Sequence, residues 1–356
     1  MIVGVFWALL AGFMLGLYAL PSKFTKEFEF ENTWGLFFLL TMFVVPLIAT
    51  FTLLKGVGDV FAQMPASKLA VVVCVSFLWG CGVMFWGKAI THIGISLGFS
   101  LFIGTVILIG SILPWFIEGL PGISPLVMIL LGIIIVLVGI MAYGKAGLLR
   151  EKDEAKEKER EQDSEEEKKG SMAKGILIAV SGGLLATGFS VANTVGRPVL
   201  HQASQKLGNP DWATAVAVMF PIFLSGGVAM TVYFIWQLNK KKAWRKFKTP
   251  RFPVNFILIF IMAFFHYAAS AVFAYSAYKL GTLGNSVGYA IFNSASVVTA
   301  VVMGLITREW VKASSKAKNW LYTGLICMIL GIVLIAVGNS LGKPDLVKTT
   351  TAVVQN

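Results

Sequence analysis

The sequence predicts an all-α integral membrane protein in which ten transmembrane helices form two inverted five-helix repeats. Hydrophobic residues make up 56% of the 356 residues and charged residues only 13%, whereas soluble domains contain about 25% charged residues. Ten separate apolar runs are each long enough to cross a bilayer. One highly charged segment divides these runs into two sets of five. Together these observations exclude a soluble globular domain.

Each apolar run approaches the roughly 20 residues that a helix needs to cross the ~30 Å hydrocarbon core. The predicted spans are residues 2–21, 34–54, 69–91, 95–117, 123–143, 175–195, 212–238, 254–278, 283–306 and 319–340. The first run has no basic residues before it and no cleavage motif, so we expect a retained span rather than a signal peptide. The predicted domains are a first repeat over 1–144, a charged linker over 145–174, a second repeat over 175–342 and a polar tail over 343–356.

The distribution of lysine and arginine predicts the orientation of the chain. Most of the 30 basic residues lie in loops that follow odd-numbered spans, such as 240–251 and 308–318. Loops rich in these residues stay in the cytoplasm, so both termini are expected on the periplasmic side of a bacterial inner membrane. These loops also explain the net charge of +12, and no nucleic-acid partner is predicted. The linker would then be a cytoplasmic connector or, alternatively, a segment that binds a partner protein.

The two halves of the chain share a pattern of glycines. Gly4 and Gly12 recur at a constant offset as Gly175 and Gly183. Further along each half, an acidic residue precedes two glycines that are seven residues apart; these residues are Glu118, Gly132 and Gly139, then Glu309, Gly324 and Gly331. With five spans in each copy, the second copy enters the membrane from the opposite side, as in transporters whose substrate site lies between the halves near the midplane. The alternative is coincidence, because the chain contains 36 glycines.

Several short motifs occur in a fixed order along the chain. They are Gly4-x-Phe-Trp7, Tyr18-Ala19, Trp79-Gly80-x-Gly82, Gly94-x-Ser96-x-Gly98, Asn193 followed by Arg197-Pro198, and Glu309-Trp310. As an ordered set over about residues 4–340, they resemble the L-rhamnose–proton symporter family, a branch of the drug/metabolite transporter superfamily. The resemblance implies a five-plus-five inverted repeat and cation-driven uptake of a deoxy-sugar. The linker is longer and more acidic than the family pattern, and Arg197 stands where a lysine is expected.

The candidate sugar-binding residues are aromatic, amide and basic side chains in or near the spans. Amides can bond to sugar hydroxyls, and aromatic rings can pack on the apolar face of a sugar. The predicted substrate-binding residues are Trp7, Tyr18, Trp79, Lys88, Asn193, Arg197, Tyr267 and Asn293. Each has a structural alternative, because aromatic rings anchor helices at the membrane surface and long basic side chains can extend to it. Asn285 shares a helix face with Asn293, and Asn293 is preferred.

His266 is the predicted proton-coupling residue. A proton symporter needs a side chain that gains and loses a proton during its cycle, and no carboxylate falls in the middle of a predicted span. Among the 3 histidines, only His266 lies well inside a span, and the imidazole titrates near neutral pH. The alternatives are a packing role for His266, with proton coupling through Lys88 or a sodium site in its place.

Other features argue against catalysis. Gly82-x4-Gly87-Lys88 matches part of a phosphate-binding motif, but Ala89 replaces the residue that would bind magnesium. The three cysteines lack metal-site spacing, so we predict no catalytic residue, no metal and no cofactor.

The predicted function is import of a small sugar, L-rhamnose or a related deoxy-sugar, by symport with a cation, in the first place a proton. The alternatives are a metabolite or drug exporter on the same fold, and a membrane scaffold or sensor.

Overall fold

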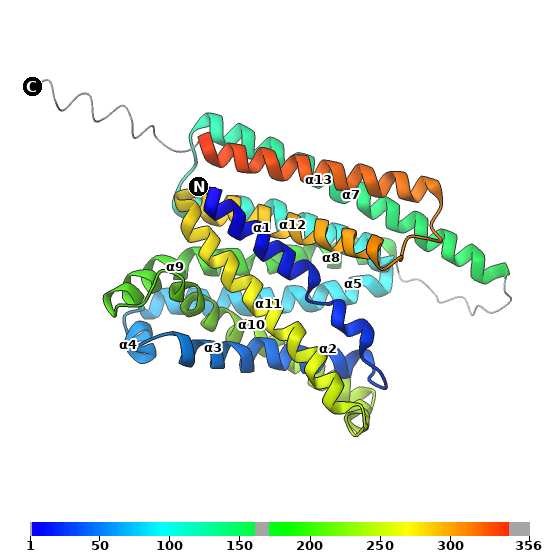
Figure 1. The fold of residues 1–356 in the computed structure, drawn as a ribbon, viewed down its shortest axis with the longest axis horizontal. Coiled ribbons are helices and arrows are strands. Elements are labelled where there is room, and N and C mark those ends of the chain that lie inside the picture. The colour runs from blue at the N-terminus through cyan, green and yellow to red at the C-terminus, as the bar shows by residue number, and fades with distance from the viewer. Residues whose placement is uncertain (1, 161–170, 342–356) are drawn as a thin grey trace, which may run out of the picture.

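In the computed structural model, which describes residues 2–160 and 171–341, all regular structure is helical (Figure 1). The elements are α1 (Ile2–Leu17), η1 (Leu20–Phe24), α2 (Phe30–Leu39), η2 (Leu40–Val44), α3 (Val45–Leu53), α4 (Val57–Ala62), α5 (Ala66–Ile112), α6 (Trp115–Glu118), α7 (Ile123–Arg160), α8 (Met172–Ala186), α9 (Gly188–Lys206), α10 (Ala213–Lys240), η3 (Ala243–Phe247), α11 (Phe252–Leu280), η4 (Gly281–Leu283), α12 (Gly284–Ile306) and α13 (Ser315–Leu341). The predicted tail over 343–356 and part of the predicted linker lie outside the described residues.

Ten helical segments in the described part of the chain are long and apolar enough to cross a membrane. These segments are Ile2–Phe24, Phe30–Leu53, Ala66–Ile90, Ser96–Glu118, Ile123–Asp153, Met172–Lys206, Ala213–Lys240, Phe252–Leu280, Gly284–Ile306 and Ser315–Leu341. Each predicted span overlaps one of them, so the prediction of an all-α protein with ten such helices is confirmed. We number the spans 1 to 10 in this order.

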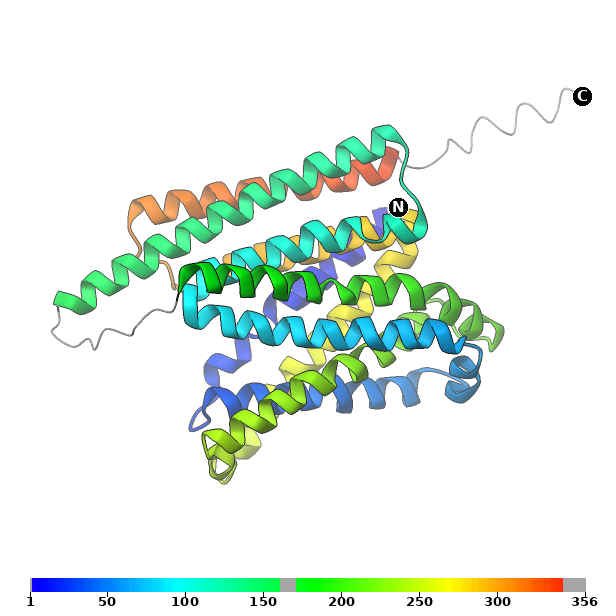
Figure 2. The ribbon, with the colours of Figure 1, turned by 180° about the vertical axis from the view of Figure 1, so that it is seen from behind.

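Gly94 lies in the short connection between spans 3 and 4, within α5. Gly94 has φ 79° and ψ 168°, a backbone conformation that is open to glycine but strained for other residues. The chain reverses its direction here, so the two parts of α5 run antiparallel (Figure 2). The start of span 4 is held by Glu151 of α7, whose Oε1 accepts hydrogen bonds from the backbone N–H and Oγ of Ser96 at 3.2 and 2.9 Å. A carboxylate at a helix N-terminus stabilises the helix dipole.

The charged linker begins as a continuation of span 5. α7 runs without a break to Arg160, so the first residues of the predicted linker are helical. Asp153 on this extension accepts a hydrogen bond from the backbone N–H of Ser314 at 3.0 Å, just before α13 begins. The extension of α7 therefore contacts the starts of two other spans, one in each half of the chain.

The helix α12 lies at the centre of the bundle. Every residue from Gly284 to Val297 is buried, and the helix packs against α1, α5, α11 and α13. Small residues permit this close packing where lipid supplies no hydrophobic drive between helices. A methyl group added at Gly12 of α1, for example, would lie 2.7 Å from the carbonyl oxygen of Phe292. The centre of the protein is consequently the helix that carries both Asn285 and Asn293.

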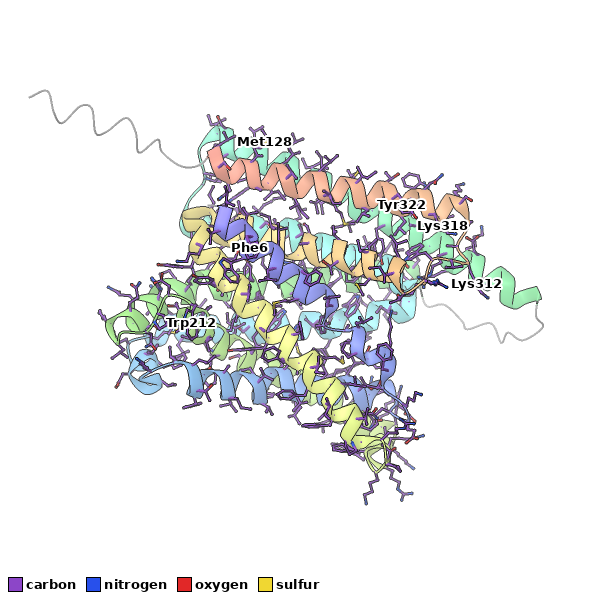
Figure 3. The ribbon with its side chains drawn as sticks, viewed as in Figure 1. Phe6, Met128, Trp212, Lys312, Lys318 and Tyr322 are labelled. Carbon is purple, nitrogen blue, oxygen red and sulfur yellow. The ribbon has the colours of Figure 1, made fainter. Side chains whose placement is uncertain are left out.

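The outer surface is mainly apolar along the middle of the bundle. Side chains such as Phe6, which is 56% exposed, point outward from it (Figure 3). Lys312 and Lys318 lie together at one end, beside the extension of α7 (Figure 3). We call this the linker end, and we call the opposite end, where α1 begins and α13 finishes, the terminus end (Figure 1).

Candidate functional site

A cavity of about 110 Å³ lies between the two halves of the chain, near the middle of several spans. The first half contributes one residue of α1 and five of α5, and the second half contributes residues of α8, α9, α11 and α12. The lining residues are Leu15, Trp79, Val83, Phe102, Ile103, Val106, Ala186, Phe189, His266, Ser270, Tyr289, Phe292 and Asn293. Most ligand pockets measure about 300–1,000 Å³, so this cavity has to widen before it can hold a sugar.

His266 is held in the cavity wall by one hydrogen bond and three aromatic rings. Its Nδ1 lies 3.1 Å from Oγ1 of Thr41, and that hydroxyl donates to the carbonyl oxygen of Ala263 at 3.1 Å. The hydroxyl has only one proton, so its oxygen accepts from Nδ1–H, and Nε2 remains as the nitrogen that can accept a proton. The rings of Tyr18, Phe37 and Phe223 lie with their centroids 5.0, 5.4 and 5.6 Å from that of the imidazole.

Aromatic rings form much of the remaining cavity wall. The ring of Trp79 lies 5.1 Å from that of Phe189, and Phe189 in turn lies 6.3 Å from Tyr289. Asn293 adds a polar group, with its Nδ2 donating to the carbonyl oxygen of Tyr289 at 2.9 Å. The lining therefore combines flat apolar faces with an imidazole, an amide and hydroxyl groups, and none of its residues is Asp, Glu, Lys or Arg.

A second group of polar residues lies toward the terminus end. Asn193 donates from Nδ2 to Oδ1 of Asn285 at 2.6 Å. Glu118 accepts at Oε1 from Nδ2 of Asn285 at 2.7 Å and from Nη2 of Arg197 at 3.1 Å. Both asparagines are 0% exposed, and the side chains of Arg197 and Glu118 are only 12% and 18% exposed. We call these four residues the polar relay.

The predicted site residues thus separate into three groups. Trp79, His266 and Asn293 line the cavity, and Tyr18 packs behind it against His266. Asn193 and Arg197 belong to the polar relay. The sequence did not separate the two groups, because residues on different helices meet only through the tertiary fold.

The other three predicted residues do not line the cavity. Trp7 packs edge-on against Tyr275 at 5.6 Å, Tyr267 is buried with its ring 5.0 Å from Phe223, and Lys88 is exposed near the turn at Gly94. A role for these residues in substrate binding stays a prediction.

Two parts of the site were missed by the sequence reasoning. Ser270 and Phe189 line the cavity, but a serine and a phenylalanine in an apolar run carry no specific signal. Glu118 was noticed in the sequence only as part of the pattern shared by the two halves. Its bonds to Arg197 and Asn285 were not foreseen. The matching position of Glu118 and Glu309 in the two halves was the one available signal.

A larger hollow elsewhere on the protein is not a candidate site. It measures about 760 Å³ and lies between η2, α5 and α10, where Phe43, Phe77 and Leu224 are among its residues. Its lining is almost wholly apolar, and several of its side chains are exposed on the outer face of the bundle. It is a lipid-facing groove. Within residues 2–160 and 171–341, no group of His, Cys, Asp and Glu could hold a metal ion.

Comparison with known proteins identifies the kind of protein to which this architecture belongs. The family model described as L-rhamnose-proton symport protein (RhaT) matches residues 1–341. The chain belongs to this family. An L-rhamnose-proton symporter of Yersinia pestis is 23% identical over 347 residues, covering 95% of this chain and 98% of the relative. One of Klebsiella pneumoniae is 23% identical over 346 residues, covering 94% and 97%.

Membership of the symport-protein family confirms the predicted resemblance to the L-rhamnose–proton symporter family. It also confirms the predicted class of function, a multi-pass membrane transporter rather than an enzyme. The family match extends over both halves of the chain and includes every cavity residue and the whole polar relay. The cavity and the relay are therefore parts of the transporter itself and not of an added domain.

Proposed function

We propose that this symporter imports L-rhamnose or a closely related deoxy-sugar together with a proton, and that the cavity is its sugar site. The observation that carries the proposal is the cavity lining, which is aromatic and hydrogen-bonding but contains no carboxylate, lysine or arginine. Such a lining suits a neutral, polyhydroxylated substrate, whereas an anionic or cationic metabolite would leave its charge unpaired in a low-dielectric site. In this proposal Asn293 bonds to sugar hydroxyls, and Trp79 packs against the apolar face of the sugar.

We assign the proton to His266. Its Nδ1–H is directed to Thr41, so Nε2 can accept a proton at the cavity wall without disturbing that hydrogen bond. A protonated imidazole among aromatic rings is costly unless a polar partner stabilises it. Sugar hydroxyls next to Nε2 would supply this partner. Binding of the sugar and binding of the proton would then favour each other, which is the requirement for symport.

The inverted five-helix repeat and a place in the drug/metabolite superfamily are supported by matching helix contacts. Gly12 in span 1 packs on Phe292 in span 9, and its counterpart Gly183 in span 6 packs on Phe102 in span 4. A methyl group at either glycine would lie 2.7 or 2.8 Å from the carbonyl oxygen of the phenylalanine. Equivalent helices of the two halves would thus make equivalent contacts, and the sugar site would lie between them.

The proposed orientation places the linker end in the cytoplasm of a bacterial inner membrane and both termini in the periplasm. The basic loops 241–251 and 307–314 lie between helices that meet at the linker end, and basic loops are retained on the cytoplasmic side. Reporter tags placed at each terminus should therefore both be accessible from the periplasmic side of the membrane.

The test of the proposed function is sugar uptake by the purified protein in proteoliposomes. With an inwardly directed proton gradient, labelled L-rhamnose should accumulate, and a protonophore should abolish the accumulation. His266→Gln should lose accumulation and keep exchange of labelled for unlabelled sugar, because exchange needs no net proton movement. His201→Gln is the matched control, because His201 bonds to Thr214 and is not a cavity residue.

Two results would overturn parts of this proposal. If no deoxy-sugar accumulates under any proton gradient while the protein is folded, the substrate or the coupling ion is wrong. If accumulation by His266→Gln equals that of the unaltered protein, the proton is carried by another group.

A further inference from the structure

Two ion pairs lie at opposite ends of the bundle, and each joins one half of the chain to the other. At the terminus end, Arg197 of span 6 binds Glu118 at the end of span 4, with 3.1 Å between Nη2 and Oε1. At the linker end, Lys23 of span 1 forms an ion pair with Glu309, which follows span 9. In both cases the cation comes from the first span of one half, and the carboxylate comes from the end of the fourth span of the other.

The cavity lies between these two pairs along a single helix. Asn285 near the start of α12 bonds to Glu118, and Asn293 of the same helix lines the cavity. The separation of eight positions between these asparagines corresponds to about 12 Å of helix. α12 then continues to Ile306, and the chain reaches Glu309 three residues later. A sugar that leaves the cavity toward either end passes the level of one of the pairs.

We propose that the pairs Glu118–Arg197 and Lys23–Glu309 are the two gates of the transport cycle, one closing each end of the path to the cavity. We call Glu118–Arg197 the terminus gate and Lys23–Glu309 the linker gate. The inference rests on the proposed transport function but not on the identity of the sugar. Opening one end requires the two halves to separate there, which breaks the ion pair and lets water solvate both charges. The pair at the other end stays closed and keeps the halves together.

The contacts around each pair fit this role. Arg197 has a second nitrogen, Nη1, that is buried and has no hydrogen-bond partner among the described residues, so separation and hydration of the pair would satisfy it. Glu309 is approached by Nη1 of Arg150 at 3.9 Å and by Oγ1 of Thr307 at 2.9 Å. Its carboxylate thus keeps partners when Lys23 moves away.

The polar relay connects the terminus gate to the substrate helix. Glu118 bonds through Asn285 to α12, so a movement of α12 when the cavity widens acts directly on the carboxylate of the gate. The bond from Asn193 to Asn285 links the same point to α9, the helix that carries Arg197. Through these bonds, both partners of the terminus gate are linked to Asn285. This asparagine lies about two helical turns from Asn293, the amide in the cavity wall.

The test uses cross-linking together with a cavity reporter and does not depend on any sugar. In a chain in which Cys74, Cys81 and Cys327 are replaced by alanine, Ser270→Cys places a single thiol in the cavity wall. Glu118→Cys with Arg197→Cys, or Lys23→Cys with Glu309→Cys, is joined by oxidation to a disulfide before a membrane-impermeant thiol label is added. The reporter thiol has no partner thiol beside it and so stays free to react with the label.

We expect each cross-link to remove labelling of the cavity thiol from one side only. Closing the terminus gate should leave labelling from the linker end, and closing the linker gate should leave labelling from the terminus end. Labelling that is unaffected by either cross-link would overturn the proposal. Failure of sugar uptake alone, with these access patterns intact, would instead count against the proposed substrate.

Charge reversal provides a second route that needs no cross-linker. Glu118→Arg alone should increase labelling of the cavity thiol from the terminus end several-fold, because two cations would repel each other across the gate. Glu118→Arg combined with Arg197→Glu should return labelling toward that of the unaltered pair. If the double variant is labelled as strongly as the single variant, the two residues do not act as a gate.

Discussion

The two ion pairs resemble each other in topology and differ in their surroundings. At the terminus end, the side chains of Arg197 and Glu118 are only 12% and 18% exposed. Glu118 also accepts a hydrogen bond from the fully buried Asn285, which in turn accepts one from the fully buried Asn193. At the linker end, the side chains of Lys23 and Glu309 are 48% and 38% exposed. Water and salt weaken an exposed pair, whereas breaking a buried pair leaves a charge without solvent. The pair at the terminus end is thus expected to be the harder of these two pairs to break.

Removal of Arg197 should have the largest effect. Arg197→Met leaves the carboxylate of Glu118 largely buried with Asn285 as its remaining partner, and the loss of one partner of a buried pair costs about 3–5 kcal/mol. The expected cost is near the lower figure because some exposure remains, and it should be measured by thermal unfolding in detergent. The double variant Arg197→Met with Glu118→Gln should recover part of the loss. A single variant as stable as the unaltered protein would show that the pair is not held in a desolvated site.

Removal of the bridging amide should have an intermediate effect. Asn285→Ala takes away the acceptor of Asn193 and one donor to Glu118, and an unsatisfied buried polar group costs about 1–3 kcal/mol. The neighbouring Ser286→Ala is the matched control, because its buried hydroxyl has no hydrogen-bond partner within the described chain. Equal unfolding temperatures for the two variants would contradict the polar relay.

Removal of Lys23 should have a small effect on stability. Exposed ion pairs contribute about 0–1 kcal/mol, and Glu309 retains Arg150 and Thr307 nearby. Lys23→Met should shift the unfolding temperature by no more than the scatter of surface variants, yet should raise labelling of the cavity thiol from the linker end. High salt should reproduce this increase in the unaltered protein, whereas the terminus end should respond less to salt.

The smallest effect is expected from mild acid at the linker end. Burial alone would raise the pKa of Glu309, but hydrogen bonds from Lys23 and Thr307 and the charges of Lys23 and Arg150 outweigh it and hold the pKa below its ordinary value. A carboxyl with a lowered pKa keeps its contribution above the ordinary value and loses it only as the pH falls through the lowered one. Labelling from the linker end, divided at each pH by the labelling of the same thiol in the unfolded protein, should therefore stay constant between pH 8 and 5. The division removes the loss of reactive thiolate as the pH falls. A rise within this interval would place the pKa of Glu309 above its ordinary value.

The features that could be predicted from the sequence are those that depend on a short stretch of the chain. The ten helices were recognised because a bilayer requires about 20 consecutive apolar residues, which is a local property of the chain. The sequence also indicated three residues of the cavity wall, His266, Trp79 and Asn293. They were chosen because polar or large aromatic side chains in a span are candidates to contact a substrate.

Pairing between distant residues could not be predicted in this way. Nothing within the neighbourhood of Glu118 indicates that Arg197 will reach it, because the contact depends on how α6 and α9 are placed. Lys88 lies inside an apolar run, and its side chain is exposed and is not part of the cavity lining, so its role in substrate binding stays a prediction. The sequence indicates how far along its span a residue lies, but it does not indicate the direction in which the side chain faces.

The extension of α7 constrains how the charged segment can change during evolution. Glu151 and Asp153 are two residues apart, which on a helix with 3.6 residues per turn turns them about 200° from each other, and they bind the starts of spans 4 and 10 on different sides. Insertion or deletion of one residue between Lys145 and Glu151 would rotate both carboxylates by about 100° away from their targets. Length variation should consequently be tolerated beyond Asp153 and selected against before it.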